Sequence, residues 1–185
     1  MRPRIKTIDD IDSSSYSSEE FNYQPKLTLI LDESNESEFN QNLLNEIVLW
    51  KTNRYVSAED LPLELLNSTK IKEKQLDENF TRELLSQLLS KTVKGIRLPM
   101  ASTILRFRNP FVYQIIDQRA YRFANLGESL KLPAKIEDQI DLYINYLKRI
   151  REIAESKNIA FENMDRLLYI LDKEENKKVK LNGYD

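Results

Sequence analysis

Apolar residues recur at helical spacing along most of this 185-residue chain, and this period constrains its fold more than any other feature. Between Ile136 and Ser156, isoleucine, leucine and tyrosine stand three or four positions apart, which places them on one face of a helix. No pair of alternating strands stands out, so the fold class is predicted to be all-α. Comparable stripes predict further helices from Glu38 onward, at Leu61–Leu66, at Thr81–Ser90 and, after a turn at Asn158, at Met164–Lys173.

Composition divides the chain into three parts. Residues 1–37 are rich in serine and acidic residues, so we expect a partly disordered arm there, followed by one helical domain at 38–175 and a charged tail at 176–185. Within the arm, Lys26–Leu31 is a short apolar run whose period does not distinguish a strand from an extended segment. The chain has no run of about 18 apolar residues, so we expect a soluble, cytoplasmic protein without a membrane partner.

The amino-acid inventory excludes several kinds of chemistry. Without cysteine or histidine, the chain cannot form a disulfide, a cysteine-ligated iron-sulfur cluster, an imidazole-metal site or a Ser-His-Asp triad. Only three glycines are present, which is too few for a glycine-rich nucleotide loop. We therefore expect no metal, no cofactor and no bound nucleotide, and any catalysis would use carboxylate, lysine, tyrosine or hydroxyl groups.

Positive charge is concentrated in the middle of the chain. Residues 91–122 contain seven basic residues and a single acid, Asp117, for a net charge of +6, although the whole chain carries −2. Such an island predicts a local face for anions, with phosphate as the first candidate. The alternative is that these charges line ordinary solvated helix faces. The basic residues are Lys91, Lys94, Arg97, Arg106, Arg108, Arg119 and Arg122.

The same segment has the pattern of a helix-hairpin-helix. One helix is predicted to end near Lys91, Gly95 supplies the backbone angles of a tight turn, and Pro99 suits the start of the next helix. The second helix, Leu98–Phe107, ends at Asn109-Pro110. A hairpin of this kind directs backbone amides and a helix N-terminus at one point, where a phosphate oxygen is well bound.

After the hairpin, an apolar segment leads to the isolated acid. Phe111–Ile116 precedes Asp117, and a helical pattern follows at Gln118–Leu126. In this order the residues resemble the helix-hairpin-helix (HhH-GPD) DNA glycosylase superfamily, whose members remove damaged or mismatched bases. Val93-Lys94-Gly95-Ile96-Arg97 stands at the family's hairpin, and Asp117 stands where the catalytic aspartate would fall. The resemblance covers about thirty residues.

The resemblance implies an activity and a set of site residues. Asp117 would be the catalytic carboxylate, which stabilises positive charge on the sugar while activating a water. A base must leave the stack first, and candidate pocket or wedge residues are Phe107, Phe111, Tyr113, Tyr121 and Trp50. The partner would be double-stranded DNA. Its predicted contacts are Lys94, Gly95, Ile96, Arg97, Arg106, Arg108, Arg119 and Arg122.

Two positions depart from the family pattern. The lysine that attacks the sugar in strand-cleaving members aligns with Pro99, so a Schiff base cannot form there and the implied enzyme is a monofunctional glycosylase. Arg97 replaces the second hairpin glycine, which changes either the phosphate contact or the capacity to bind DNA.

Three alternatives follow from the residues themselves. Asp117 can serve as a helix N-cap, because aspartate is favoured there, and Arg106, Arg108, Arg119 and Arg122 can pair with acids on other helices and contact no nucleic acid. If Asp117 only caps a helix, the protein would be a noncatalytic helix-hairpin-helix DNA-binding module, for which the hairpin phosphate contacts suffice. A further alternative is a helical protein-interaction domain that uses its acidic surface and N-terminal arm, with the basic island neutralised internally.

Overall fold

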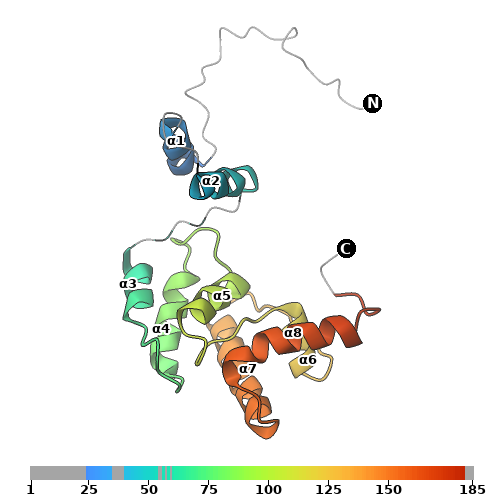
Figure 1. Ribbon diagram of the computed structural model, residues 1–185. Helices are drawn as coiled ribbons and strands as arrows, with labels where there is room; N and C mark the ends of the chain where they lie inside the picture. The colour runs from blue at the N-terminus through green and yellow to red at the C-terminus, as the bar shows by residue number, and fades with distance from the viewer. Residues whose placement is uncertain (1–23, 35–39, 54–55, 57, 59, 182–185) are drawn as a thin grey trace, which may run out of the picture. The chain divides into compact units, whose positions relative to one another are not determined.

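Helices account for most of the structure. The computed structural model describes residues 24–34, 40–53, 56, 58 and 60–181 (Figure 1). No β-strand is found among these residues, which confirms the all-α prediction. In chain order the helices are α1 (Pro25–Glu33), α2 (Gln41–Lys51), α3 (Asp60–Ser68), α4 (Glu78–Leu88), α5 (Leu98–Arg108), α6 (Gln118–Ala124), α7 (Ile136–Ser156), the 3-10 helix η5 (Phe161–Asn163) and α8 (Met164–Glu175).

The chain divides into two compact units, Met1–Tyr55 and Val56–Asp185. The boundary predicted at residue 38 differs from this division, because α2 packs with α1 in the first unit. The predicted partly disordered arm falls mainly on residues 1–23 and 35–37, which lie outside the described residues.

In the first unit, the apolar run Lys26–Leu31 belongs to helix α1, so neither a strand nor an extended segment forms there. Its neighbour explains the difference: Leu27 is 1% exposed, and the indole Nε1 of Trp50 in α2 donates a hydrogen bond to Thr28 Oγ1 at 2.9 Å. Pro25 lies in the first turn, where its missing N–H costs nothing. A helical partner therefore decides the conformation of a run too short to specify its own period.

The core of the second unit is built on α7, which has the predicted bounds. One face of this helix is buried through residues three or four positions apart, and it contacts both α4 and α6. Helix α4 contributes Leu84, Leu85 and Leu88 to the same core. The buried α7 residues include Ile140, Tyr143, Ile144, Leu147 and Ile150.

The C-terminal helix α8 packs back on α6. Helices α6 and α8 are in close contact, and Asn158, at a φ of 53°, makes the predicted turn between α7 and η5. Arg122 of α6 donates to the carbonyl oxygens of Val179 and Lys180 at 3.5 and 3.3 Å. The described part of the predicted charged tail is therefore held against the domain by its backbone.

Within the described residues, no helix is both long enough and apolar enough to cross a bilayer.

Candidate nucleic-acid interface

The hairpin between α4 and α5 is anchored by apolar side chains. Val93 is 5% exposed, Leu98 is fully buried, and Ile96 packs against the core. Gly95 takes a φ of 84°, a left-handed conformation that favours glycine. Arg97 has φ −123° and ψ 169°, which any residue adopts, so the arginine at the second glycine position causes no backbone strain.

Three basic side chains project from this hairpin. Lys91, Lys94 and Arg97 are all exposed, and none of them makes an ion pair with another described residue. Arg97 is also the N-cap residue of α5, where no side chain caps the helix and Pro99 occupies the first turn. Two features that favour phosphate binding therefore lie at the same place, namely cations without an ion-pair partner among the described residues and the positive end of a helix dipole.

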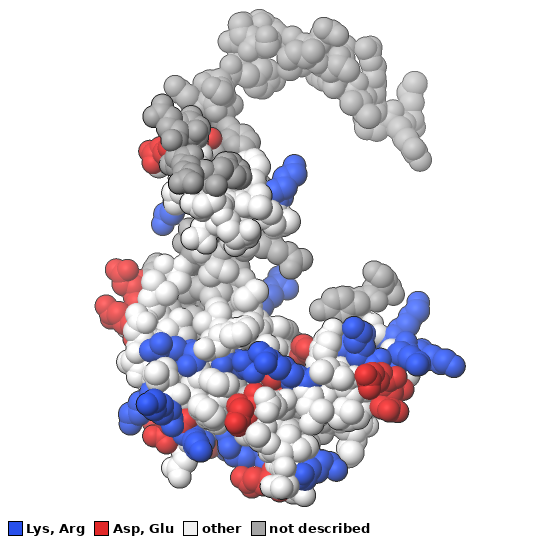
Figure 2. All heavy atoms as spheres, in the orientation of Figure 1, with Lys and Arg blue, Asp and Glu red and all other residues white. Residues whose placement is uncertain are grey.

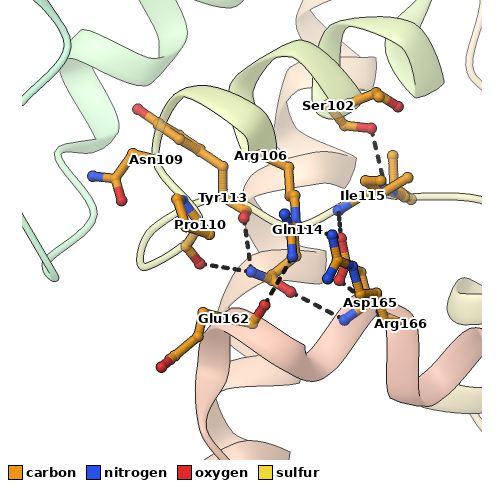
Figure 3. A network of polar contacts seen from close by, with 12 residues as sticks. Ser102, Arg106, Asn109, Pro110, Tyr113, Gln114, Ile115, Glu162, Asp165 and Arg166 are labelled. Carbon is orange, nitrogen blue, oxygen red and sulfur yellow. Dashed lines mark hydrogen bonds and ion pairs between the residues drawn. The ribbon is translucent and has the colours of Figure 1, made fainter. Parts of the chain in front are cut away.

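Arg106 and Arg108, predicted to contact DNA, are used inside the protein. Arg106 is 8% exposed, its Nε lies 3.3 Å from Asp165 Oδ2, and its Nη2 donates to the Glu162 carbonyl oxygen at 3.1 Å (Figure 3). Arg108 donates from Nε and Nη2 to the carbonyl oxygens of Leu66 and Asn67, both at 2.8 Å. These two bonds cap the C-terminal end of α3, which lacks basic residues of its own.

Arg119 and Arg122, also predicted to contact DNA, both pair with an acid inside the protein. Asp172 of α8 is fully buried. Arg122 forms a bidentate pair with it, donating from Nε to Oδ1 at 2.9 Å and from Nη2 to Oδ2 at 2.8 Å. Arg119 Nη1 lies 3.2 Å from the same carboxylate. The assignment of Arg106, Arg108, Arg119 and Arg122 to DNA stays a prediction, although each of the four guanidinium groups makes at least one intramolecular contact. The alternative of internal pairing is confirmed for Arg106, Arg119 and Arg122.

Asp117 caps helix α6. Its Oδ1 accepts the N–H of Ala120 at 2.7 Å, and its backbone is extended, as expected of an N-cap residue. Burial raises the pKa of its carboxyl above the usual value, while the Ala120 and Arg119 backbone amides and the Arg119 charge oppose the shift. The capping prediction is confirmed. A half-buried carboxyl with a raised pKa also has the character of a general base.

A buried polar network holds the segment that leads to Asp117. Asp165 Oδ2 accepts the Ile115 N–H at 3.1 Å, and Gln114 Oε1 accepts the Asp165 N–H at 3.0 Å (Figure 3). The hydroxyls of Tyr143 and Tyr146 donate to the carbonyl oxygens of Gln114 and Ile115 at 2.9 and 3.0 Å. This irregular stretch therefore has its backbone satisfied by side chains, which fixes the approach to Asp117.

The aromatic candidates lie in different environments. Phe107 is 69% exposed on α5, with the Arg106 guanidinium 5.4 Å from its ring centre, whereas Tyr113 is 3% exposed. Tyr121 stacks on Tyr146 with ring centres 6.0 Å apart. Trp50 belongs to the first unit. Among the candidates in the second unit, Phe107 has the exposed ring.

Two cavities lie elsewhere in the second unit. One, of about 330 Å³, lies between the α3–α4 connection and residues 109–113, and the other, of about 290 Å³, lies beside it against α7. Neither is lined by Asp117 or by the hairpin. Sequence reasoning predicted neither cavity. The α3–α4 connection is rich in charged residues, and its sequence gives no sign that it lines a cavity.

Surface charge on the second unit is mixed rather than uniformly basic. On the face drawn in Figure 2, Lys and Arg side chains are interleaved with Asp and Glu. A nonspecific polycation is therefore a poor description of this face, and any anion site must be a local one.

Comparisons with known proteins give no match: no protein-family model, no curated protein and no solved structure is significantly similar to this chain.

Proposed function

We propose that the second unit is a helix-hairpin-helix domain that binds the phosphate backbone of duplex DNA through residues 91–97. The observation that carries this proposal is the turn at Gly95, with φ 84° and with Lys91, Lys94 and Arg97 exposed around it. The turn is anchored by Val93, so its cations are presented from a rigid position. Contacts of this kind depend on charge and geometry and carry no base sequence information.

Salt dependence is the sharpest test of the interface. Three phosphate contacts predict that the logarithm of the association constant falls with the logarithm of salt at a slope of about −2.7, using about −0.9 per contact. The measurement is fluorescence anisotropy of a labelled duplex titrated with the full chain between 25 and 200 mM salt, these concentrations being roughly the range in which such binding changes most.

A matched pair of variants localises the contacts. Lys94→Gln with Arg97→Gln removes two hairpin charges and should reduce the slope to about −0.9, since one contact remains. Lys157→Gln with Lys173→Gln removes the same charge from two exposed sites on α7's end and α8, and should leave the slope unchanged. If both double variants weaken binding equally, the hairpin is not the interface. If the wild type does not bind duplex at all, the protein-interaction alternative replaces this proposal.

A second candidate function adds catalysis to the same scaffold, as the family resemblance implies. The observation that favours it is Asp117, whose pKa burial raises and whose orientation the Ala120 N–H fixes. In this proposal the domain is a monofunctional DNA glycosylase, in which the Asp117 carboxylate activates water and stabilises the developing positive charge on the sugar. Pro99 supplies no amine, so the reaction leaves an abasic site and an intact strand.

The catalytic proposal is tested by base release. Duplexes that each contain one damaged, deaminated or mismatched base are incubated with the protein, and alkali then reveals abasic sites. Asp117→Asn is the appropriate variant, because asparagine caps a helix about as well as aspartate and the fold is kept. Activity in the wild type that is lost in Asp117→Asn supports a glycosylase. Salt-dependent binding without base release from any lesion supports a noncatalytic DNA-binding module, with Asp117 acting only as a cap.

A further inference from the structure

The cavity of about 330 Å³ in the second unit has a composition that the DNA interface does not use. Its walls are the α3–α4 connection on one side and residues 109–113 on the other. The rings of Phe80 and Tyr113 contribute apolar surface, and the carboxylates of Glu73 and Asp77 also line it. Its volume lies at the lower end of the range for small-molecule sites, about 300–1,000 Å³.

The walls are held in place before any ligand binds. Asn109 is 1% exposed, and its Nδ2 donates to the carbonyl oxygens of Lys70 and Glu73 at 2.8 and 3.0 Å. Arg108 fixes the start of the same connection through the carbonyl oxygens of Leu66 and Asn67. The charged connection is therefore tied by its backbone to the segment that faces it across the cavity. Preorganised walls lower the ordering cost of binding.

The hydroxyl of Tyr113, a residue that lines this cavity, can still accept a hydrogen bond. Thr81 Oγ1 donates its only proton to the Asp77 carbonyl oxygen at 2.7 Å. In the 3.0 Å contact between Thr81 Oγ1 and the Tyr113 hydroxyl, Tyr113 must therefore be the donor. No other described residue donates to the Tyr113 oxygen, so its lone pairs are available. Figure 3 shows the Tyr113 ring directed away from the Gln114–Asp165 network.

The ionisable groups of the cavity favour positive charge. Glu73 and Asp77 oppose a single cation, Lys70, which leaves a net charge of −1 on the lining. Burial raises the pKa of the Tyr113 hydroxyl, the hydrogen bond with Thr81 opposes the shift, and the nearby Asp77 charge adds to it. Each carboxylate accepts a backbone N–H through one of its oxygens: Asp77 from Phe80, and Glu73 from Lys74. The second oxygen of each carboxylate accepts no hydrogen bond from a described residue and is available to a ligand.

We infer that this cavity binds a small organic cation, a guanidinium or primary ammonium group on an aliphatic stem. The cationic head would donate to the free carboxylate oxygens and to the Tyr113 oxygen, while the stem would pack against the rings of Phe80 and Tyr113. The same chemistry is offered by a free alkylguanidine and by the arginine side chain of a peptide. The inference is independent of DNA binding, since the cavity does not include the hairpin.

Amide chemical shifts of the full-length protein test this inference directly. The probes are n-butylguanidine, N-acetyl-arginine amide and the neutral isostere n-butylurea, each titrated into uniformly ¹⁵N-labelled protein in a buffer free of organic cations. Saturable shifts at residues 69–77 and 109–113 are expected with the two cations, with a Kd of about 1 mM for a ligand of this size. The tighter of the two cations identifies the free or the peptide-borne source.

Two variants separate charge from hydroxyl. Asp77→Asn keeps the α4 N-cap, so the fold is retained, and should weaken butylguanidine about fivefold. Tyr113→Phe keeps the charge and should weaken it about threefold. Glu83→Gln, an exposed acid-to-amide change elsewhere on α4, is the control and should change affinity by less than about twofold. Butylurea binding as tightly as butylguanidine, or cation shifts absent from the cavity residues, would overturn the inference.

Discussion

Breaking the Asp172–Arg122 pair should destabilise the second unit by a large fraction of its total stability. Asp172 is fully buried and accepts hydrogen bonds from Arg122, Arg119 and Asn176. Asp172→Ala leaves the Arg122 guanidinium, with an 8% exposed side chain, without its counter-charge. Removing one partner of a buried pair costs about 3–5 kcal/mol. Because the carbonyl oxygens of Val179 and Lys180 still accept from Arg122, we expect about 3 kcal/mol.

A double-mutant cycle shows whether the loss belongs to the pair. Arg122→Met should also cost about 3 kcal/mol, since it leaves Asp172 buried with fewer donors. The double variant should cost about the same as either single variant, because no charge of that pair is then left unpaired. The coupling energy is thus predicted to be about 3 kcal/mol, at the upper end of measured values.

Urea unfolding followed by far-UV circular dichroism is the appropriate assay. The chain's only tryptophan, Trp50, lies in α2 and reports on the first unit, so tryptophan fluorescence does not follow the change. With an m-value of about 2 kcal/mol per molar urea, each single variant should lower the midpoint by about 1.5 M. A loss below about 1 kcal/mol, together with additive effects in the double variant, would refute the interpretation of a buried and uncompensated charge.

Acid should remove the same stabilisation. Burial alone would raise the pKa of the Asp172 carboxyl, but the hydrogen bonds and charge of Arg122, with Asn176 and Arg119, lower it below the usual value. A carboxyl with a lowered folded-state pKa stabilises the fold above its unfolded pKa of about 3.9 and loses that contribution as pH falls through the folded value. The stability difference between wild type and the Arg122→Met, Asp172→Ala variant should therefore shrink as pH falls below about 4.

Three further substitutions have defined outcomes. Gly95→Ala should cost about 1 kcal/mol in thermal unfolding, because φ 84° strains a residue with a Cβ, and an unchanged melting temperature would contradict that geometry. Asp117→Ala should lower the free energy of unfolding by about 1 kcal/mol, because the α6 cap is lost. Asp117→Asn keeps the cap and should be neutral or slightly stabilising above the raised pKa of Asp117, where ionising the half-buried carboxyl disfavours folding. If the two variants lose the same stability in urea unfolding, Asp117 does not act as a cap. Arg108→Met should cost about 1–2 kcal/mol by uncapping α3 and leave the salt slope of DNA binding unchanged, and a reduced slope would return Arg108 to the interface.

Helices with a long apolar stripe could be predicted from the sequence to within about three residues at each end. The α7 stripe fixes both ends of a 21-residue helix, and the Leu84, Leu85 and Leu88 spacing locates α4. Long periodic segments specify their own conformation, because the buried face and the helical repeat coincide. The run at Lys26–Leu31 is too short for this, and its helical state depends on contact with α2.

The wall of the cavity could not be predicted for a related reason. The connection between α3 and α4 looks exposed because its side chains are charged, and most of them are indeed exposed. What closes the cavity is the backbone, whose carbonyl oxygens are held by Arg108 and Asn109 from about 40 residues away in the chain. A pattern of side chains contains no information about backbone carbonyl partners at that separation.

The net charge of a short segment does not show which of its basic residues are free to bind an anion. Asp165 and Asp172 stand 50 or more residues beyond the arginines that they neutralise, outside any window that scores the island as +6. Seven phosphate-binding cations would give a salt slope of about −6, whereas the three cations of the hairpin give about −2.7. A measured slope near −6 would mean that duplex DNA competes successfully with Asp165 and Asp172 for buried arginines. Such competition would have to break two buried ion pairs, which is costly, whereas a slope near −2.7 leaves both pairs in place and supports the internal pairing.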